Sequence, residues 1–329
     1  MELFLQQVFN GIMLGSTYAI VALGLTLVFG ILHVPNFAHG HMYMLGAYVC
    51  FFLITIFGFA YWPAVALAAI LLAVAGVILE VLVFKPLRND PGFNPLIAAL
   101  GALIILENVV VVLWGPEGHR IPNPYPGIID FFGITMSVQR LLVIGMAAAM
   151  IILLQLFIKK TTLGNTIEAV AQNKEGATLV GINVNFVSAM TFAISTALAA
   201  IAACLVAPIF MISPSMGALV GMKAFVIVIL GGLGSIPGVV VGAAVVTLLN
   251  IDFLQTLSLE LSRLRQGAEY IPLIGIPWAE LPSQLDPARY QRLVFGIILI
   301  LMMIFRPEGI IPSKRRKLEI HEHNEEESL

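Results

Sequence analysis

Long apolar runs recur along almost the whole chain, and they restrict its possible folds more than any other feature. A bilayer core about 30 Å thick needs roughly 20 apolar residues in each helix that crosses it. Nine segments come close enough to this length to be candidate spans. They are residues 4–31, 42–58, 62–84, 94–114, 138–158, 187–211, 217–233, 236–251 and 289–306.

The composition points to the same fold class. Hydrophobic residues make up 59% of the chain and charged residues 11%, whereas soluble domains carry about 25% charged residues. The sequence therefore predicts an all-α protein, a polytopic transmembrane helical bundle of eight or nine spans with broken helices. The number stays open because residues 217–233 and 236–251 are short, so they form either two spans or one broken hairpin.

Basic residues indicate the orientation, because loops rich in Lys and Arg stay in the cytoplasm. With nine spans and the N-terminus outside, ten basic residues fall on the inner side and six on the outer side. We therefore expect a cytoplasmic C-terminus. A net charge of −2 provides no basic stripe, so nucleic acid is not an expected partner. Cys50 and Cys204 lie within apolar runs and are expected to be reduced and buried.

These patterns divide the chain into a transmembrane domain, which contains three non-membrane segments, and a tail. Residues 1–313 form the predicted transmembrane domain, and residues 314–329 form a charged cytoplasmic tail that we expect to be disordered. Residues 252–288 contain an amphipathic stripe and should lie on the outer membrane surface. The polar loop at about 159–186 lies on the inner side, and a loop rich in Pro and Gly at 115–137 lies outside.

The stretch "HVPNFAHGH", residues 33–41, interrupts the first apolar region. Irregular backbone at membrane depth survives only where protein or a water-filled cavity surrounds it. Pro35 and Gly40 break the helix there, and polar side chains flank the break. This pattern favours a translocation pathway that includes Asn36, Phe37, His39 and Gly40.

Other interpretations of this stretch compete. A metal site on His33, His39 and His41 lacks a nearby Cys, Asp or Glu, and His39 and His41 would point apart on a helix. A cytoplasmic turn with solvated histidines also fits. The chain has no HExxH, GxSxG or paired-aspartate motif, so neither catalytic nor metal residues are assigned. Alanine at His33 and His41 is expected to leave transport largely intact.

A second break occurs in "KAFVIVILGGLGSIPGVVVGA", residues 223–243. It adds Gly232, Gly234 and Pro237 to the predicted pathway. No GK[ST] follows, so this glycine-rich stretch does not bind ATP. Glu107 is a carboxylate well inside a predicted span and is a further pathway candidate, or else a neutral acid that bonds another helix. Lys223 lies near a span end and can snorkel to the surface.

The inner loop predicts two short helices. Asn165 can cap the first and Asn173 the second, and Gly181 can stop the second. Small exposed apolar faces on both helices suggest a docking surface, although a plain connecting loop is the alternative. Paired glycines such as Gly217 and Gly221 predict close helix packing.

Three stretches together resemble the permeases of branched-chain amino acid ABC transporters. They are "FNGIMLGSTYAIVALGLTLVFGILHVPNFAHGHMYMLGAY", "AVAQNKEGATLVGINV" and "GMKAFVIVILGGLGSIPG". The resemblance covers nearly the whole chain in the same order. It implies a non-catalytic subunit of an importer in the inner (cytoplasmic) membrane, working with a second similar permease, two cytoplasmic ATPases and an extracytoplasmic binding protein.

The resemblance also implies roles for the inner loop. This loop would rest in a groove of the ATPase, which uses the ATP, while the chain itself needs no cofactor. The coupling residues would be Glu168, Ala171, Asn173, Ala177, Leu179 and Gly181. The loop departs from the importer pattern EAA-x3-G, because Lys174 stands where the glycine would fall.

The expected substrates are branched-chain or other small hydrophobic amino acids. The same kind of importer for urea, short amides or small organic acids is an alternative. A gated channel, a membrane scaffold and a metal-dependent membrane enzyme are alternatives from other classes. The inner loop distinguishes an ABC permease from a channel, because a channel has no need of an ATPase-docking surface.

Overall fold

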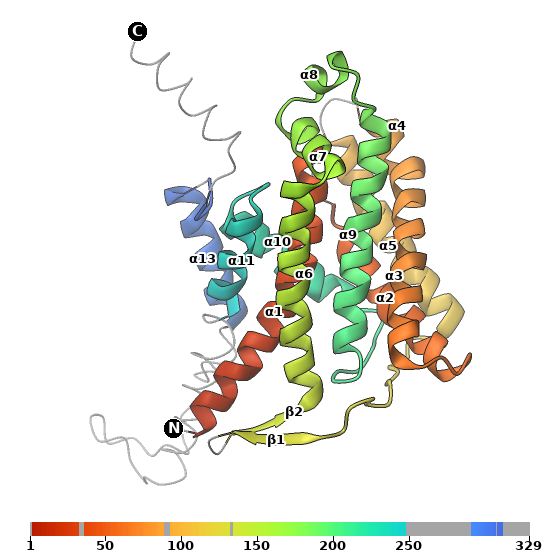
Figure 1. Cartoon of the computed structure of the whole chain (residues 1–329), viewed down its shortest axis with the longest axis vertical. Coiled ribbons are helices and arrows are strands. Elements are labelled where there is room, and N and C mark those ends of the chain that lie inside the picture. The colour runs from red at the N-terminus through yellow and green to blue at the C-terminus, as the bar shows by residue number, and fades with distance from the viewer. Residues whose placement is uncertain are drawn as a thin grey trace.

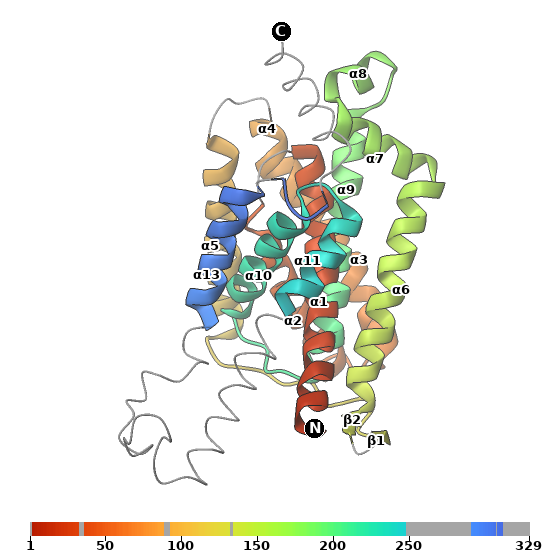
Figure 2. The same cartoon turned by 90° about the vertical axis from the view of Figure 1, so that its left-hand side faces the viewer.

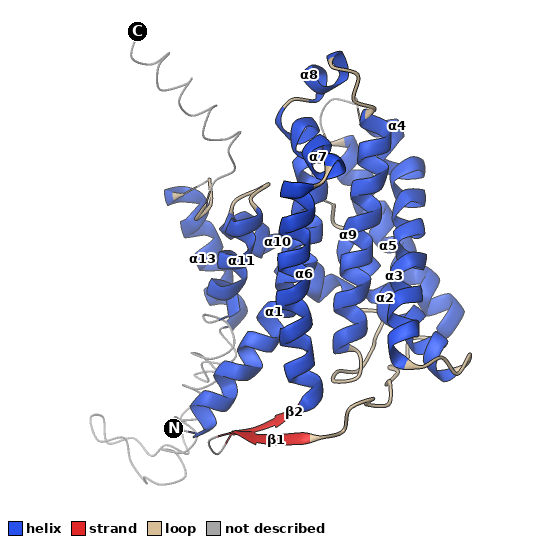
Figure 3. Cartoon of the chain, in the orientation of Figure 1, coloured by secondary structure: helices blue, strands red, loops and turns tan. Residues whose placement is uncertain are grey.

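The chain folds as a helical bundle with one small β-hairpin (Figure 3). The structure, a computed structural model, describes residues 2–32, 36–88, 93–131, 134–247, 291–306 and 308–311. The first half contains α1 (Glu2–Leu32), α2 (His39–Thr55), α3 (Tyr61–Leu79), the π-helix η1 (Glu80–Phe84), α4 (Lys85–Leu87), α5 (Asn94–Trp114), β1 (Ile128–Phe131) and β2 (Ile134–Ser137). The second half contains α6 (Val138–Lys160), α7 (Thr162–Gln172), α8 (Lys174–Leu179), α9 (Val184–Val206), α10 (Met216–Gly231), α11 (Ile236–Thr247) and α13 (Gln291–Phe305).

Five helices of the described chain are long and apolar enough to cross a membrane. They are Val8–Ile31, Tyr61–Leu87, Asn94–Trp114, Val138–Lys160 and Val184–Val206. The pair α10 and α11 adds a sixth if it is one broken span. The polytopic helical class is confirmed, whereas the predicted eight or nine spans are not confirmed by the described residues. The helix α2, with 17 residues, falls just below the required length.

The pair α10 and α11 is bent by 118° at its break, so the chain turns back on itself. The described part of α11, 12 residues, extends about 18 Å. The chain after Thr247 lies outside the described residues, so the choice between two spans and one broken hairpin stays as the sequence left it.

The helices α1 and α9 form the centre of the bundle, and α5 and α6 lie at its edges (Figures 1 and 2). In α1, 72% of the apolar stretch is buried, against 17% in α5. Small residues allow the central helices to approach closely. A side chain at Gly46 would meet Ala200, and one at Gly76 would meet Thr196.

A buried hydrogen-bond network joins α3, α6 and α9 near the β-hairpin end. The Gln139 amide donates to the Leu205 carbonyl at 2.9 Å and to the Tyr61 hydroxyl at 3.2 Å. The Tyr61 hydroxyl donates in turn to the Cys204 carbonyl at 3.1 Å. Because these polar groups are buried, their mutual pairing fixes the three helix ends relative to one another.

The two ends of the bundle differ. The helices α4, α7 and α8 lie at one end, while β1, β2 and the start of α1 lie at the other (Figures 1 and 2). The antiparallel hairpin pairs Ile128 with Ser137. The sequence predicted an ordered outer segment there but no strand, because its Pro and Gly content signalled turns only.

Some sequence predictions concern other parts of the chain. The amphipathic segment at 252–288 and the tail at 314–329 lie outside the described residues, as does His33. Cys50 and Cys204 are free and buried, as predicted.

Candidate translocation site and docking loop

The first break lies deep inside the bundle. His39, the first residue of α2, has its Nε2 atom 3.0 Å from the carbonyl oxygen of Val21 in α1. Val21 precedes Leu32, the last residue of α1, by eleven positions, which is about 16 Å along the helix. The start of α2 therefore lies deep inside the bundle, beside the middle of α1. His39 and His41 are both buried, so the alternative of a cytoplasmic turn with solvated histidines does not hold for these two residues.

His39 ties α2 to two central helices. The Val21 carbonyl can only accept a hydrogen bond, so the Nε2 atom of His39 carries the proton. Its Nδ1 atom lies 3.4 Å from the Ser195 hydroxyl of α9, which also donates to the Gly24 carbonyl at 2.7 Å. His39 is 1% exposed, so it links α1, α2 and α9 without contact with solvent.

Asn36 shapes the turn before α2. Its Oδ1 atom accepts a hydrogen bond from the Ala38 backbone N–H at 3.1 Å, and its carbonyl accepts one from His39 N–H at 3.2 Å. The Nδ2 atom of Asn36 is buried and has no partner within the described part of the chain. A buried donor without a partner is costly, and this one is available to a polar group that enters the site.

A side-chain hydrogen bond joins His41 to Glu107 within the membrane-spanning region. The His41 Nε2 atom lies 3.2 Å from the Glu107 Oε2 atom of α5. The His41 side chain is fully buried, whereas 35% of the Glu107 side chain is exposed. The sequence selected Glu107 but missed this partner, since 66 residues separate the two positions and no local pattern connects them.

His39 and His41 thus face different helices, as their spacing on a helix predicted. Among the described residues no group of three or more His, Cys, Asp or Glu side chains comes together in a way that could hold a metal ion. The metal-dependent enzyme therefore has no geometric support from His39 and His41.

The first break packs directly on α10. A side chain at Gly40 would collide with the Gly217 carbonyl oxygen and with the backbone of Gly221. The Phe37 and Phe225 rings lie beside this contact with their centroids 5.2 Å apart. The paired glycines Gly217 and Gly221 therefore allow close approach, as predicted, and the helix they meet is the one that begins at the first break.

The second break is built differently. Gly232 has φ of +109°, a backbone conformation that side chains other than glycine rarely adopt. The turn after α13 covers it, because the Ile310 N–H donates to the Leu230 carbonyl at 2.8 Å and the Ile311 N–H donates to the Gly231 carbonyl at 3.1 Å. Gly234 and Pro237 are exposed.

Glycines also hold α10 and α11 together next to this turn. Side chains at Gly231 or Gly238 would each collide with the backbone of the other residue. The hydroxyl of Ser235 caps α11 by accepting a hydrogen bond from the Gly238 N–H at 3.2 Å. The second break is thus a tightly packed hairpin turn, whereas the first is a polar interruption inside the bundle.

Lys223 does not simply snorkel. Its Nζ atom donates to the Tyr18 hydroxyl of α1 at 3.2 Å and lies 4.9 Å from the centroid of the Tyr18 ring. The hydrogen bond and the aromatic face together stabilise the half-buried ammonium group.

The inner loop forms two helices, but one predicted cap is wrong. Thr161 caps α7, since its hydroxyl accepts a hydrogen bond from the Gly164 N–H at 3.0 Å, and Asn165 lies inside that helix. Asn173 caps α8 as predicted, accepting from the Gly176 N–H at 2.7 Å. Gly181, with φ of +85°, follows the end of α8.

The apolar face of α7 points inward, contrary to the prediction. Ile167 and Val170 are buried, as is Ala177 of α8. The most exposed apolar side chains of the loop are Leu179, which is 87% exposed, and Val180, which is 76% exposed; Phe186, in the first turn of α9, is 56% exposed. The loop therefore presents one small apolar tip, at the end of α8, instead of two apolar faces. Glu168, Ala171 and Asn173 lie on the same loop.

Comparison with known proteins identifies the family. The sequence model of the family described as "Branched-chain amino acid transport system / permease component" matches residues 7–303. The chain belongs to this family. The resemblance of the three sequence stretches is thereby confirmed.

Individual relatives match over more than nine tenths of this chain. The chain is 34% identical to the high-affinity branched-chain amino acid transport system permease protein BraD of Pseudomonas aeruginosa, over 94% of this chain and 95% of that one. It is 36% identical, with the same coverage, to the permease protein LivH of Escherichia coli strain K12. It is 27% identical to the permease protein LivM of Salmonella typhimurium, over 92% of this chain and 69% of that one.

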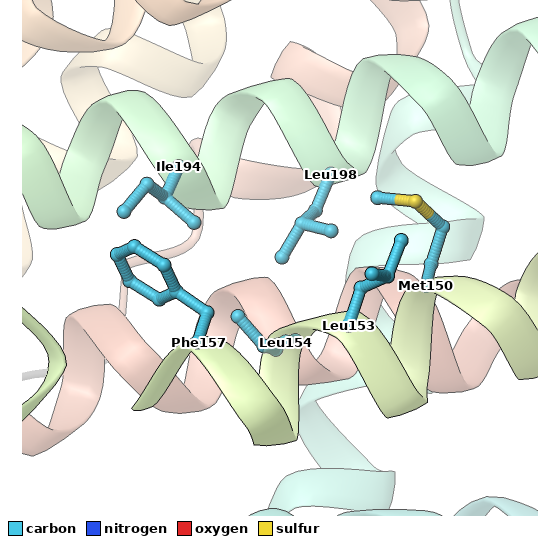
Figure 4. Close-up of a pocket in the computed structure, with 6 residues that line it drawn as sticks. All are labelled: Met150, Leu153, Leu154, Phe157, Ile194 and Leu198. Carbon is cyan, nitrogen blue, oxygen red and sulfur yellow. The ribbon is translucent and has the colours of Figure 1, made fainter. Parts of the chain in front are cut away.

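An apolar cavity of about 170 Å³ lies elsewhere, between α6 and α9. Figure 4 shows its lining, formed by Met150, Leu153, Leu154, Phe157, Ile194 and Leu198. None of these side chains carries a hydrogen-bonding group for an amino or carboxyl group. The cavity suits an acyl chain, and we do not assign it to the transport path of this permease.

Proposed function

We propose that this chain is a membrane-spanning subunit of an ATP-driven importer for branched-chain and other small hydrophobic amino acids. The observation that carries the proposal is family membership across residues 7–303. The relatives are named as branched-chain amino acid transport permeases. The chain acts without catalysis or a cofactor of its own, and partner subunits hydrolyse the ATP.

Two cytoplasmic ATPase subunits are the proposed source of energy, and one of them would bind this chain at the tip of α8. The exposure of Leu179 and Val180 supports this assignment, because apolar side chains exposed outside a membrane mark a protein contact. The caps at Thr161 and Asn173 and the turn at Gly181 hold the tip in a fixed shape. Glu168, Ala171 and Ala177 would support the tip from behind.

The proposed translocation pathway passes the first break. Asn36 supplies an unpaired donor, Glu107 supplies an accessible carboxylate, and Phe37 and Gly40 lie against α10. An amino acid carries both an ammonium and a carboxylate group, so a path with both donors and acceptors suits it. Gly232, Gly234 and Pro237 form the turn of the second break, and we propose that this turn borders the pathway without contacting the substrate.

The second permease subunit would pack against α5. This helix is the least buried of the five candidate spans, and Glu107 lies at the edge of its exposed face. A carboxylate exposed to lipid is costly, so a protein surface or a water-filled path between two permeases is its expected surrounding. A similar argument does not apply to α6, whose exposed face at Ile152, Leu153 and Leu156 is apolar.

We place the chain in the inner (cytoplasmic) membrane with the α8 end in the cytoplasm. Two pairs of basic residues support this orientation, because positive charge stays in the cytoplasm. They are Lys85 and Arg88, at the two ends of α4, and Lys159 and Lys160, at the end of α6. The extracytoplasmic binding protein would then dock at the end that carries β1 and β2.

Reconstitution tests this function. The chain would be purified with its second permease and two ATPases and placed in liposomes with the binding protein and ATP. We expect leucine, isoleucine or valine to raise ATP hydrolysis and to accumulate inside. If urea, an amide or an organic acid raises ATP hydrolysis instead, the substrate belongs to that class. Uptake that needs no ATP would favour a gated channel.

A further inference from the structure

A buried ion pair connects the start of η1 to the residue that follows α4. The Arg88 guanidinium pairs with the Glu80 carboxylate, and the two side chains are only 8% and 1% exposed. Buried ion pairs add little to stability, because removing both charges from water offsets their attraction. The pair is therefore weak evidence for added stability, and its position between two helices suggests another role.

Glu80 begins a π-helix. Regular α-helical hydrogen bonding ends at Leu79, and η1 continues over Glu80–Phe84. Short π-helical segments within α-helices are frequent at functional sites. Phe84, at the end of η1, is buried against Phe192 of α9 with ring centroids 5.2 Å apart. The π-segment is thus held at one end by Arg88 and at the other by α9.

Arg88 also reaches the base of the docking loop. Its Nη1 atom donates to the Asn185 Oδ1 atom at 2.9 Å, and Asn185 lies in the first turn of α9, which follows α8. The pKa of Lys174, the first residue of α8, is lowered by partial burial and then by the positive charge of Arg88. One guanidinium group therefore joins Glu80 at the start of η1 to Asn185 at the start of α9.

The π-segment has room to move. A groove of about 230 Å³ lies beside it, lined by Leu79, Val83, Ala98, Gly101, Ala102, Ile105 and Leu106. A side chain built at Gly101 would meet no atom within 4 Å. A displacement of η1 toward α5 would therefore meet little steric resistance.

We propose that Arg88 is a positioning residue that transmits movement of the docking loop to the membrane helices through Glu80 and the π-segment. This proposal rests on the proposed importer function. When the ATPases close and displace α8, the start of α9 moves with it, and Arg88 carries this movement to η1. The planar guanidinium suits this role because it bonds Glu80 and Asn185 at the same time, which a lysine ammonium reproduces poorly.

The test uses the complete importer in liposomes and measures the number of substrate molecules taken up per ATP hydrolysed. The informative variant is the double change Glu80→Gln with Arg88→Met. It removes both buried charges while keeping similar side-chain volumes, so no lone charge remains to disturb folding. The control is Lys159→Gln, which removes an exposed basic residue at the same end of the bundle.

We expect the double variant to assemble with its ATPases and to melt within a few degrees of the wild type, with uptake per ATP reduced at least tenfold. The single change Asn185→Ala should reduce uptake per ATP less than the double change does, because it removes the hydrogen bond from Arg88 to α9 and keeps the pair with Glu80. Arg88→Lys should also be only partly active. The control should match the wild type.

Two results would overturn the inference. One is a double variant with wild-type uptake per ATP, since a purely structural ion pair is replaceable by a neutral pair. The other is a double variant that no longer assembles with the ATPases while Arg88→Lys couples normally. Failure of the wild-type importer to couple uptake to ATP would instead refute the proposed function itself.

Discussion

His39 and His41 are separated by one residue, and each binds a different helix. His39 donates to the Val21 carbonyl of α1, and His41 pairs with Glu107 of α5. Loss of His41 would leave the Glu107 carboxylate in the membrane without its partner, which is costly. The expectation from the sequence that alanine at His41 leaves transport intact therefore no longer holds.

Replacement of Glu107 by glutamine tests the pathway at this scale. We expect uptake by the reconstituted importer to fall about tenfold, equivalent to about 1.4 kcal/mol, because an amide cannot offer a charge to the substrate ammonium group. Assembly with the ATPases should be unchanged, since glutamine can still bond His41.

The control is Ser16→Ala in α1, because the Ser16 hydroxyl donates to the Ile12 carbonyl of its own helix at 2.6 Å. Normal uptake by the Glu107→Gln variant would remove Glu107 from the pathway.

At the scale of elements, the contact between α2 and α10 depends on three glycines. We expect Gly40→Ala to destabilise the bundle by about 1 to 3 kcal/mol, since the new methyl group would meet the Gly217 carbonyl and the Gly221 backbone. Thermal unfolding in detergent measures the effect.

Gly145→Ala in α6 is the matched control for this substitution. A side chain there meets nothing within 4 Å, so the unfolding temperature should stay the same or rise. Equal unfolding temperatures for the two variants would show that α2 and α10 do not pack as described.

The docking helix allows a second test at this scale. Leu179→Asp should weaken association with the ATPase at least tenfold, measured by co-purification or by titration in detergent, because a charge replaces an exposed apolar contact. Phe210→Asp, at a partly exposed apolar position after α9, should leave association unchanged. A Leu179→Asp variant that binds the ATPase normally would place the contact elsewhere.

Apolar runs were sufficient to locate most helices. The predicted segment 94–114 coincides with α5, and 138–158 falls within α6. The cap at Asn173 was also readable, since a cap depends on residues three positions apart. Contacts between distant segments could not be predicted from the sequence. His41 lies 66 residues from Glu107, and the pair of Glu80 and Arg88 spans eight residues, beyond the spacing at which helical ion pairs are expected.

The direction of the apolar face of α7 could not be predicted from the sequence either. Ile167 and Val170 have the spacing of an apolar helix face, which the sequence assigned to an exposed surface. Whether such a face meets a partner or the chain's own bundle depends on the path of the neighbouring helices. The β-hairpin at 128–137 was missed because each strand has only four residues.

At the scale of the whole molecule, both cysteines are buried, which permits a test of orientation. A cysteine at Leu179 should react with a membrane-impermeant maleimide only from the cytoplasmic side. A cysteine at Ile128 should react only from the opposite side. The wild-type chain should remain unlabelled until it is denatured. Labelling of both positions from one side would contradict the proposed arrangement.

The turn at Glu308–Ile311 forms backbone hydrogen bonds to Leu230 and Gly231, which precede it by about eighty positions. During synthesis, these two hydrogen bonds can form only after residue 311 has left the ribosome. Until then, the carbonyl oxygens at the end of α10 need another partner, such as water or a chaperone of the insertion machinery.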